Sequence, residues 1–144
     1  MGLFPDSKTF EKCLEGFFNL MADTPIIADK LLESKMIIRF VYSDPDVVIT
    51  IDCSGDKIDV RPGDTDTKVI VEMTMSSDIA HKFWFGRVNL MAALTRKQMI
   101  AKGPVPKVLK LLPAIKPSYE MYPPYLMENG YAEYNVHEVK AGGS

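Results

Sequence analysis

An acidic residue and a histidine stand at a spacing that could support acid–base chemistry. His81 follows Asp78 by three residues in a segment that predicts a helix, so the two side chains would share one helix face. A carboxylate that orients an imidazole is the arrangement of a general base. No Ser or Cys within a nucleophile motif accompanies the pair. We therefore interpret Asp78 as part of a helix cap with His81 as its surface neighbour. A small enzyme centred on the two residues is the alternative.

Three carboxylates and two thiols are the other groups that could bind a metal. Asp59, Asp64 and Asp66 surround a Pro-Gly turn, but their spacing lacks the Gly and the Glu that a calcium loop requires. Cys13 and Cys53 lie far apart, and two cysteines cannot supply a metal cage, so we expect free thiols in a reducing compartment. There is no glycine-rich phosphate loop. The sequence therefore predicts no metal and no cofactor, and it favours binding over catalysis.

The bulk composition excludes several classes of protein. The chain has 144 residues, of which 47% are apolar and 25% charged, with nine methionines and a formal net charge of -2. This length predicts one domain, which we place at residues 1–140, with 141–144 as a disordered tail. The acidic balance argues against a nucleic-acid binder. The apolar runs are too short to span a membrane and no secretory signal is visible, so we expect a cytoplasmic protein.

Periodicity predicts helices at both ends of the chain with strands between them, which is an α+β arrangement. Apolar residues at three- and four-residue spacing after Asp6 predict a first helix, and Thr24-Pro25 begins a second. The period then changes to two. Strands are expected at 36–43, 47–53, 57–61 and 67–75, joined by short turns into an antiparallel meander.

The second half of the chain returns to helical patterns. Helices are predicted at 77–85, at 90–95 and from about 104 to 112, with a last strand at 97–102. Gly86 fits the left-handed position that ends the first of these helices. The segment 119–127 is crowded with Tyr, Pro and Met. Its prolines disfavour a regular helix, and its amphipathic side chains should pack back onto the domain.

Charge is distributed unevenly along the chain. Residues 79–119 contain eight basic residues and no acidic one, whereas the rest of the chain contains nine basic and nineteen acidic residues. Such a segment could contact an anionic membrane, the anionic headgroup of a ligand or an acidic partner. Alternatively, these lysines and arginines find their counter-charges within the fold.

The same segment is richer in apolar side chains than one helix face requires. Residues 83–85 are Phe-Trp-Phe, and residues 90–94 are apolar nearly all round. A helix that is apolar on all sides is buried on all sides or borders a cavity. These residues could therefore line a pocket for an apolar ligand, or they could simply fill the core.

Several short segments in the middle of the chain follow one another in a characteristic order. They are a strand at 69–75, the cap Ser76-Ser77-Asp78, the turn Gly86-Arg87-Val88-Asn89, the short helix around Ala92-Ala93-Leu94, the strand Met99-Ile100-Ala101-Lys102-Gly103 and the helix Val108-Leu109-Lys110-Leu111-Leu112. This ordered set resembles the sterol-carrier-protein domain, and the resemblance extends to about residue 115. Two features depart from the family. Thr95-Arg96-Lys97 stands where the family often has Gly-Lys, and the Tyr/Pro/Met tail has no counterpart.

The resemblance implies an α+β fold with a five-stranded, mostly antiparallel sheet and helices covering one face. It also implies a non-catalytic protein that holds a fatty acid, fatty acyl-CoA, sterol or phospholipid in a tunnel between sheet and helices. From the matching segments and their apolar neighbours we expect lipid contacts at Ile79, Phe83, Trp84, Met91, Leu94, Met99, Val105, Val108, Leu109, Leu112, Met121 and Tyr122. We expect contacts with a headgroup or an anionic membrane at Arg87, Arg96, Lys97, Lys107 and Lys110.

One alternative keeps the fold but not the ligand. With a filled core, the same domain would be a protein-interaction or accessory module that docks a partner through its basic face or its tyrosine-rich tail. A homodimer or a larger enzyme would then be the partner. The tail could also cap or plug a tunnel.

Overall fold

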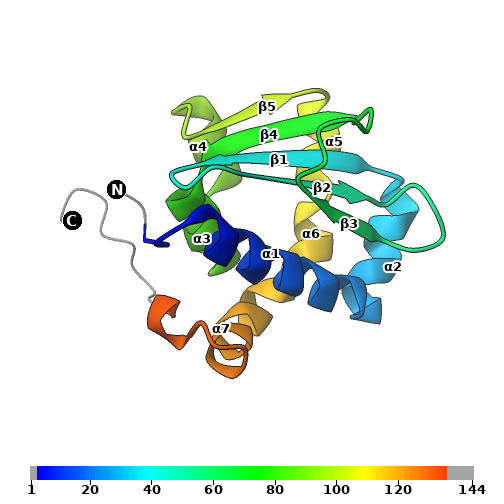
Figure 1. Cartoon of the computed structure of the whole chain (residues 1–144). Helices are drawn as coiled ribbons and strands as arrows, with labels where there is room; N and C mark the ends of the chain where they lie inside the picture. The colour runs from blue at the N-terminus through cyan, green and yellow to red at the C-terminus, as the bar shows by residue number, and fades with distance from the viewer. Residues whose placement is uncertain (1–2, 136–144) are drawn as a thin grey trace.

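The structure, a computed structural model, describes residues 3–135, so the expected tail at 141–144 lies outside the described residues. In chain order the elements are α1 (Ser7–Ala22), α2 (Pro25–Ser34), β1 (Ile37–Ser43), β2 (Val47–Asp52), β3 (Asp59–Pro62), β4 (Val71–Ser76), α3 (Ser77–Trp84), α4 (Leu90–Thr95), β5 (Met99–Lys102), α5 (Val105–Leu109), α6 (Leu112–Ile115), α7 (Ser118–Glu128) and the 3-10 helix η1 (Ala132–Tyr134). In Figure 1 the sheet lies above α1, α2, α3 and α6, and α7 lies farther from it, below α1.

The five strands form one sheet in the order β3-β2-β1-β4-β5. Strand β2 pairs antiparallel with β1 and with β3, and β4 pairs antiparallel with β5. Strands β1 and β4 pair in parallel, with Phe40 opposite Met73. The predicted fold class, a five-stranded and mostly antiparallel sheet, is confirmed. The predicted meander of the first four strands is wrong, because the chain crosses from one edge of the sheet to the far side of β1 before β4 begins.

A buried arginine holds this crossover in place. Arg39 alternates along β1 with Ile38 and Phe40, so its side chain projects from the sheet face opposite to theirs. Its Nε donates to Thr50 Oγ1 at 3.2 Å and to the carbonyl of Asp64 at 3.1 Å, and its Nη2 donates to the carbonyl of Thr67 at 2.6 Å. The guanidinium therefore connects the crossover at 63–70 to the sheet. The alternation of residues along a strand does not predict such long-range hydrogen bonds.

Side-chain caps set the ends of the helices around the sheet. The Asp6 carboxylate accepts from the N–H of Thr9 at 2.8 Å, which begins α1 as predicted. The Ser76 hydroxyl accepts from the N–H of Ile79 at 3.2 Å and begins α3 directly after β4. Gly86 follows α3 with a φ of 76°, the left-handed conformation predicted for it. The single helix expected from about 104 to 112 is instead two short helices, α5 and α6.

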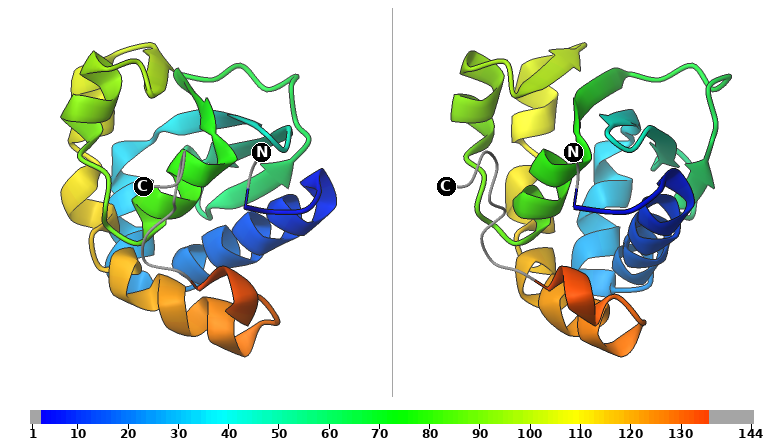
Figure 2. Two further views of the ribbon diagram at one scale, coloured as in Figure 1. Left: turned by 90° about the vertical axis from the view of Figure 1, so that its left-hand side faces the viewer. Right: turned by 60° about the vertical axis from the view of Figure 1, so that its left-hand side comes forward.

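The tail forms a helix despite its two prolines. Pro123 and Pro124 lie inside α7, so the prediction that prolines prevent a regular helix is wrong. Each proline removes one backbone hydrogen bond. Tertiary burial outweighs this loss, because α7 buries Tyr122, Tyr125 and Leu126. Figures 1 and 2 show α7 beneath α1, on the side away from the sheet. The prediction that the tail packs back onto the domain is confirmed.

Candidate functional site

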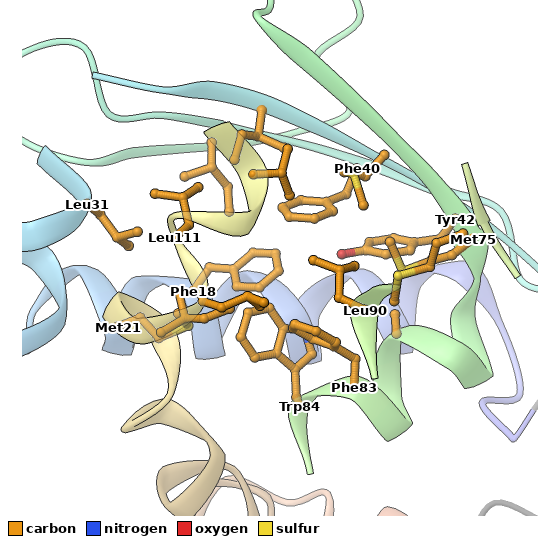
Figure 3. A pocket seen from close by; sticks show the side chains of 18 residues that line it. Phe18, Met21, Leu31, Phe40, Tyr42, Met75, Phe83, Trp84, Leu90 and Leu111 are labelled. Atoms are coloured by element: carbon orange, nitrogen blue, oxygen red, sulfur yellow. The ribbon is translucent and has the colours of Figure 1, made fainter. Parts of the chain in front are cut away.

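A cavity lies between the sheet and the helices, with a volume of about 90 Å³. Its sheet wall comes from β1, β2, β4 and β5, and its helical wall from α1 to α6 (Figure 3). The lining residues are Phe18, Met21, Leu31, Ile38, Phe40, Tyr42, Ile51, Met73, Met75, Ala80, Phe83, Trp84, Leu90, Met99, Val108, Leu111, Leu112 and Ile115.

The chemistry of this lining is almost entirely hydrocarbon and thioether. None of the lining side chains is charged, and the Tyr42 hydroxyl and the Trp84 indole are their only polar groups. Burial raises the pKa of Tyr42 well above its usual value, so its hydroxyl stays neutral. A site of this composition can bind alkyl chains or rings, and its wall contains no carboxylate, imidazole, thiol or amino group.

The cavity is small for a whole lipid. Pockets for small-molecule ligands typically measure about 300–1,000 Å³, several times the present volume. Four of the lining residues are the methionines Met21, Met73, Met75 and Met99. Methionine adapts its shape at low cost because its side chain is unbranched and polarizable. The wall can therefore yield to a larger guest if the helices or their side chains move outward.

The sequence around this cavity matches a known protein family. Residues 18–116 match the model of the SCP-2 sterol transfer family, and this range contains all five strands and every residue that lines the cavity. The chain belongs to this family. No curated protein matches it significantly in sequence.

Three solved structures of low sequence identity share the fold. Sterol carrier protein 2 from Yarrowia lipolytica in its apo form aligns with a TM-score of 0.61 and 16% identity, over 74% of this chain and 89% of the other. Domain 2 of the sterol carrier protein of Helicoverpa armigera aligns with a TM-score of 0.59 and 17% identity, over 72% and 85%. A double mutant of the sec-alkyl sulfatase PisA1 gives 0.59 and 18%, but 68% of this chain covers only 15% of that enzyme.

The structure places five of the twelve expected lipid contacts in the wall of this cavity. These are Phe83, Trp84, Met99, Val108 and Leu112. The other seven lie elsewhere. Met91 is 54% exposed, because α4 turns Leu90 and Ala93 inward and Met91 outward. Met121 lines a surface groove between α1 and α7. Tyr122 is fully buried but contacts His81 instead of the cavity. The remaining four are partly buried outside the cavity wall: Ile79, Leu94, Val105 and Leu109.

Most of the cavity wall comes from residues that are not among the twelve expected lipid contacts. Phe18 and Met21 belong to the apolar stripe of α1, and Ile38, Phe40 and Tyr42 to the inward face of β1. An apolar stripe has the same periodicity whether it fills a core or borders a void. The lining residues on the strands could have been found from which strands lie beside the segments that match the family. That step requires the correct strand order.

The basic residues of 79–119 do not find counter-charges within the described part of the chain. The ion pairs that residues 3–135 form among themselves are those of Arg61 with Asp52 at 3.3 Å and with Asp59 at 2.7 Å. Arg87, Arg96 and Lys97 are exposed around α4. Lys107 and Lys110 border a different groove, between α2 and α5–α6.

The His81 side chain is fully buried, so its expected position as a surface neighbour is wrong. Its Nε2 lies 2.7 Å from the carbonyl of Tyr134, and its Nδ1 lies 2.7 Å from the Tyr122 hydroxyl. Because a carbonyl only accepts, Nε2 carries the proton, and Tyr122 donates to Nδ1. Asp78 instead accepts from the N–H of Leu3 at 2.8 Å. Both ring nitrogens are occupied, so the imidazole ties α3 to α7 and η1 and has no position free for a substrate.

This burial predicts a pH dependence of stability. Burial lowers the pKa of His81 from 6.5 to about 4, so the unfolded chain binds a proton more readily between these values. The stabilisation from neutral His81 is complete above pH 6.5 and is lost as the pH falls toward 4. We expect a loss of roughly 2 kcal/mol between pH 7 and pH 4.5. Urea unfolding at both values measures it. His81→Gln should remove this part of the loss while the carboxylates titrate unchanged, and equal losses in both proteins would contradict the assignment.

The two cysteines are inert in this environment. Cys13 and Cys53 are both buried and free. Burial raises the pKa of each thiol to about 12, so neither forms an appreciable thiolate at neutral pH. Within residues 3–135, no three His, Cys, Asp or Glu side chains gather as a metal site would require. Among the same residues, no helix is long and apolar enough to cross a membrane.

Proposed function

We propose that this protein binds an apolar or amphipathic lipid in the cavity beneath its sheet and carries it without chemical change. One observation carries the proposal: an apolar cavity without a charged side chain in its wall, in a chain that belongs to a sterol transfer family. The ligand classes we propose are a fatty acid, a fatty acyl-CoA, a sterol-like molecule or a phospholipid. Sterol carriers are also what two of the similar structures are called.

The energetics favour binding even though the cavity must enlarge. Each buried methylene contributes about 0.8 kcal/mol, so ten contribute roughly 8 kcal/mol before the costs of association and of opening the wall. Micromolar affinity corresponds to about 8 kcal/mol net of those costs, so a chain of more than ten methylenes is needed to offset them. The cost of opening is modest where flexible methionines yield, and higher where rings such as Phe18 and Trp84 would have to move.

Native mass spectrometry of the purified protein tests the proposal directly. We expect a mass excess that corresponds to co-purified lipid, and saturable binding of a fluorescent fatty acid to delipidated protein. The absence of both co-purified lipid and fluorescent-lipid binding would contradict it. Competition between palmitate, palmitoyl-CoA, cholesterol and lysophosphatidylcholine would then rank the ligand classes.

The alternative of an interaction module is less well supported. It needs a filled core, whereas this core contains a cavity whose wall has no charged side chain. A partner enzyme remains a proposal, motivated by the sulfatase of which a similar domain makes up a small part. We propose that the protein contacts an anionic membrane transiently to take up and release lipid. The basic segment 79–119 lacks counter-charges among the described residues, so it remains available for such a contact.

A further inference from the structure

A surface groove meets the cavity at a single shared side chain. The groove runs between the end of α2 and the α5–α6 segment, and it is lined by Lys30, Glu33, Ser34, Met36, Lys107, Lys110, Leu111, Pro113 and Ala114. Leu111 also lines the cavity. Figure 3 shows Leu111 beside Leu31, at the end of the cavity near α2. Leu111 therefore faces both the apolar cavity and the groove on the surface.

The charge of this groove is positive. Lys30 reaches it from α2, and Lys107 and Lys110 reach it from the opposite side. All three lysines are exposed, and none has an ion-pair partner among residues 3–135. Glu33 is the one acidic residue in the lining. Three ammonium groups against one carboxylate leave the groove with a net positive charge.

The backbone at the end of α2 opposes an anion there only in part, because two of its terminal carbonyls accept local hydrogen bonds. The Ser34 hydroxyl donates to the carbonyl of Leu31 at 2.5 Å, and the N–H of Lys35 donates to the carbonyl of Leu32 at 3.3 Å. The terminal carbonyls, which would otherwise present partial negative charge, are thus partly satisfied within the helix end. The lysines therefore determine the sign of the groove.

The geometry points to a lipid whose anionic headgroup lies among Lys30, Lys107 and Lys110 while its chain passes Leu111 into the cavity. This inference rests on the proposed function and adds to it the class of ligand, the position of its headgroup and the side from which it enters. Carboxylate and phosphate headgroups share the required charge. Arg87, Arg96 and Lys97, which the sequence equally suggested for headgroup contact, line neither the groove nor the cavity.

A pair of fluorescent probes that differ only in headgroup charge tests the inference. We would measure the binding of cis-parinaric acid and of its methyl ester to delipidated full-length protein at pH 8. Wild type should bind the acid about tenfold more tightly, as expected for several screened surface charges. The triple variant Lys30→Gln, Lys107→Gln, Lys110→Gln should lose this preference and keep its affinity for the ester. The matched control Arg87→Gln, Arg96→Gln, Lys97→Gln should retain the preference.

Each outcome has a distinct meaning. Equal binding of acid and ester by wild type, or loss of the preference in the control instead of the groove variant, would overturn the headgroup position while leaving lipid binding intact. If neither probe binds wild type, the proposed function fails, and this inference fails with it. In a second arm, lysophosphatidic acid and palmitate displace the probe from wild type. Stronger displacement by the first assigns the groove to phosphate, and by the second to carboxylate.

Discussion

Leu111→Trp is expected to lower lipid affinity by at least about tenfold without unfolding the protein. Leu111 contributes to the wall of a cavity of about 90 Å³, so a larger ring has a void to enter. Filling that void takes space from the ligand chain. Displacing only two methylenes at about 0.8 kcal/mol each exceeds the 1.4 kcal/mol that corresponds to a tenfold change in affinity. Titration with a fluorescent fatty acid measures the loss.

Met91→Trp is the matched control for this substitution. Met91 lies outside the cavity and is 54% exposed, so the same ring added there should leave lipid affinity unchanged. Thermal unfolding of both variants should stay close to wild type, because neither ring is forced into packed core. Val108→Phe, at a second cavity-lining position, guards against a local effect at Leu111. Unchanged affinity in both Leu111→Trp and Val108→Phe would show that lipid does not occupy this cavity.

Local structure was readable from the sequence because local physics determines it. The caps at Asp6, Ser76 and Asn89 lie where short polar side chains precede apolar periodic segments, and all three accept hydrogen bonds from the following turn. The left-handed residue at Gly86 was predictable for the same reason. Strand positions followed from alternation: β2 begins at the predicted residue, and the starts of the other strands are shifted by one to four residues.

Strand order was not readable from the same signals. Short turns favour neighbouring antiparallel strands, and nothing in the pattern of β3 or β4 indicates that β4 pairs with β1 instead. The parallel pairing depends on long-range contacts such as those of Arg39 with the carbonyls of Asp64 and Thr67. The part of the cavity wall that β1 supplies was missed as a consequence, because β1 reaches the cavity beside β4 only in this order.

The packing position of α7 on α1 could not be predicted from the sequence either. At Gly16 on α1, an added Cβ would lie 2.2 Å from the Tyr125 hydroxyl, so the missing side chain provides room for α7. The Tyr125 hydroxyl donates to the carbonyl of Cys13 at 2.8 Å in the same place. A glycine within an amphipathic helix reads only as a mild cost to helix formation. Its role depends on a partner more than a hundred residues away in sequence, since 112 residues separate Cys13 from Tyr125.

The helix α7 lies beyond the matched family segment, which ends at residue 116, yet it contributes fully buried side chains. The Tyr122 ring lies 4.6 Å from the Phe17 ring and 5.1 Å from the Phe85 ring, measured between centroids. Phe17 in turn lies 5.4 Å from Trp84, which lines the cavity. The tail is therefore part of the packing that supports one wall of the site, and it is not an appendage beside it.

Tyr122→Ala should consequently lower the free energy of unfolding by about 3–5 kcal/mol, the usual cost of removing a fully buried ring from a core. Met127→Ala on the same helix is the matched control, because Met127 is 56% exposed and its truncation should change stability by less than about 0.5 kcal/mol. Urea unfolding of all three proteins measures the difference. Tyr122→Phe separates packing from hydrogen bonding, since it keeps the ring and removes only the donor to His81 Nδ1, at an expected cost of about 1–3 kcal/mol. If Tyr122→Ala were as stable as Met127→Ala, the Tyr122 ring would not stabilise the fold, and the cavity wall at Trp84 would not depend on it.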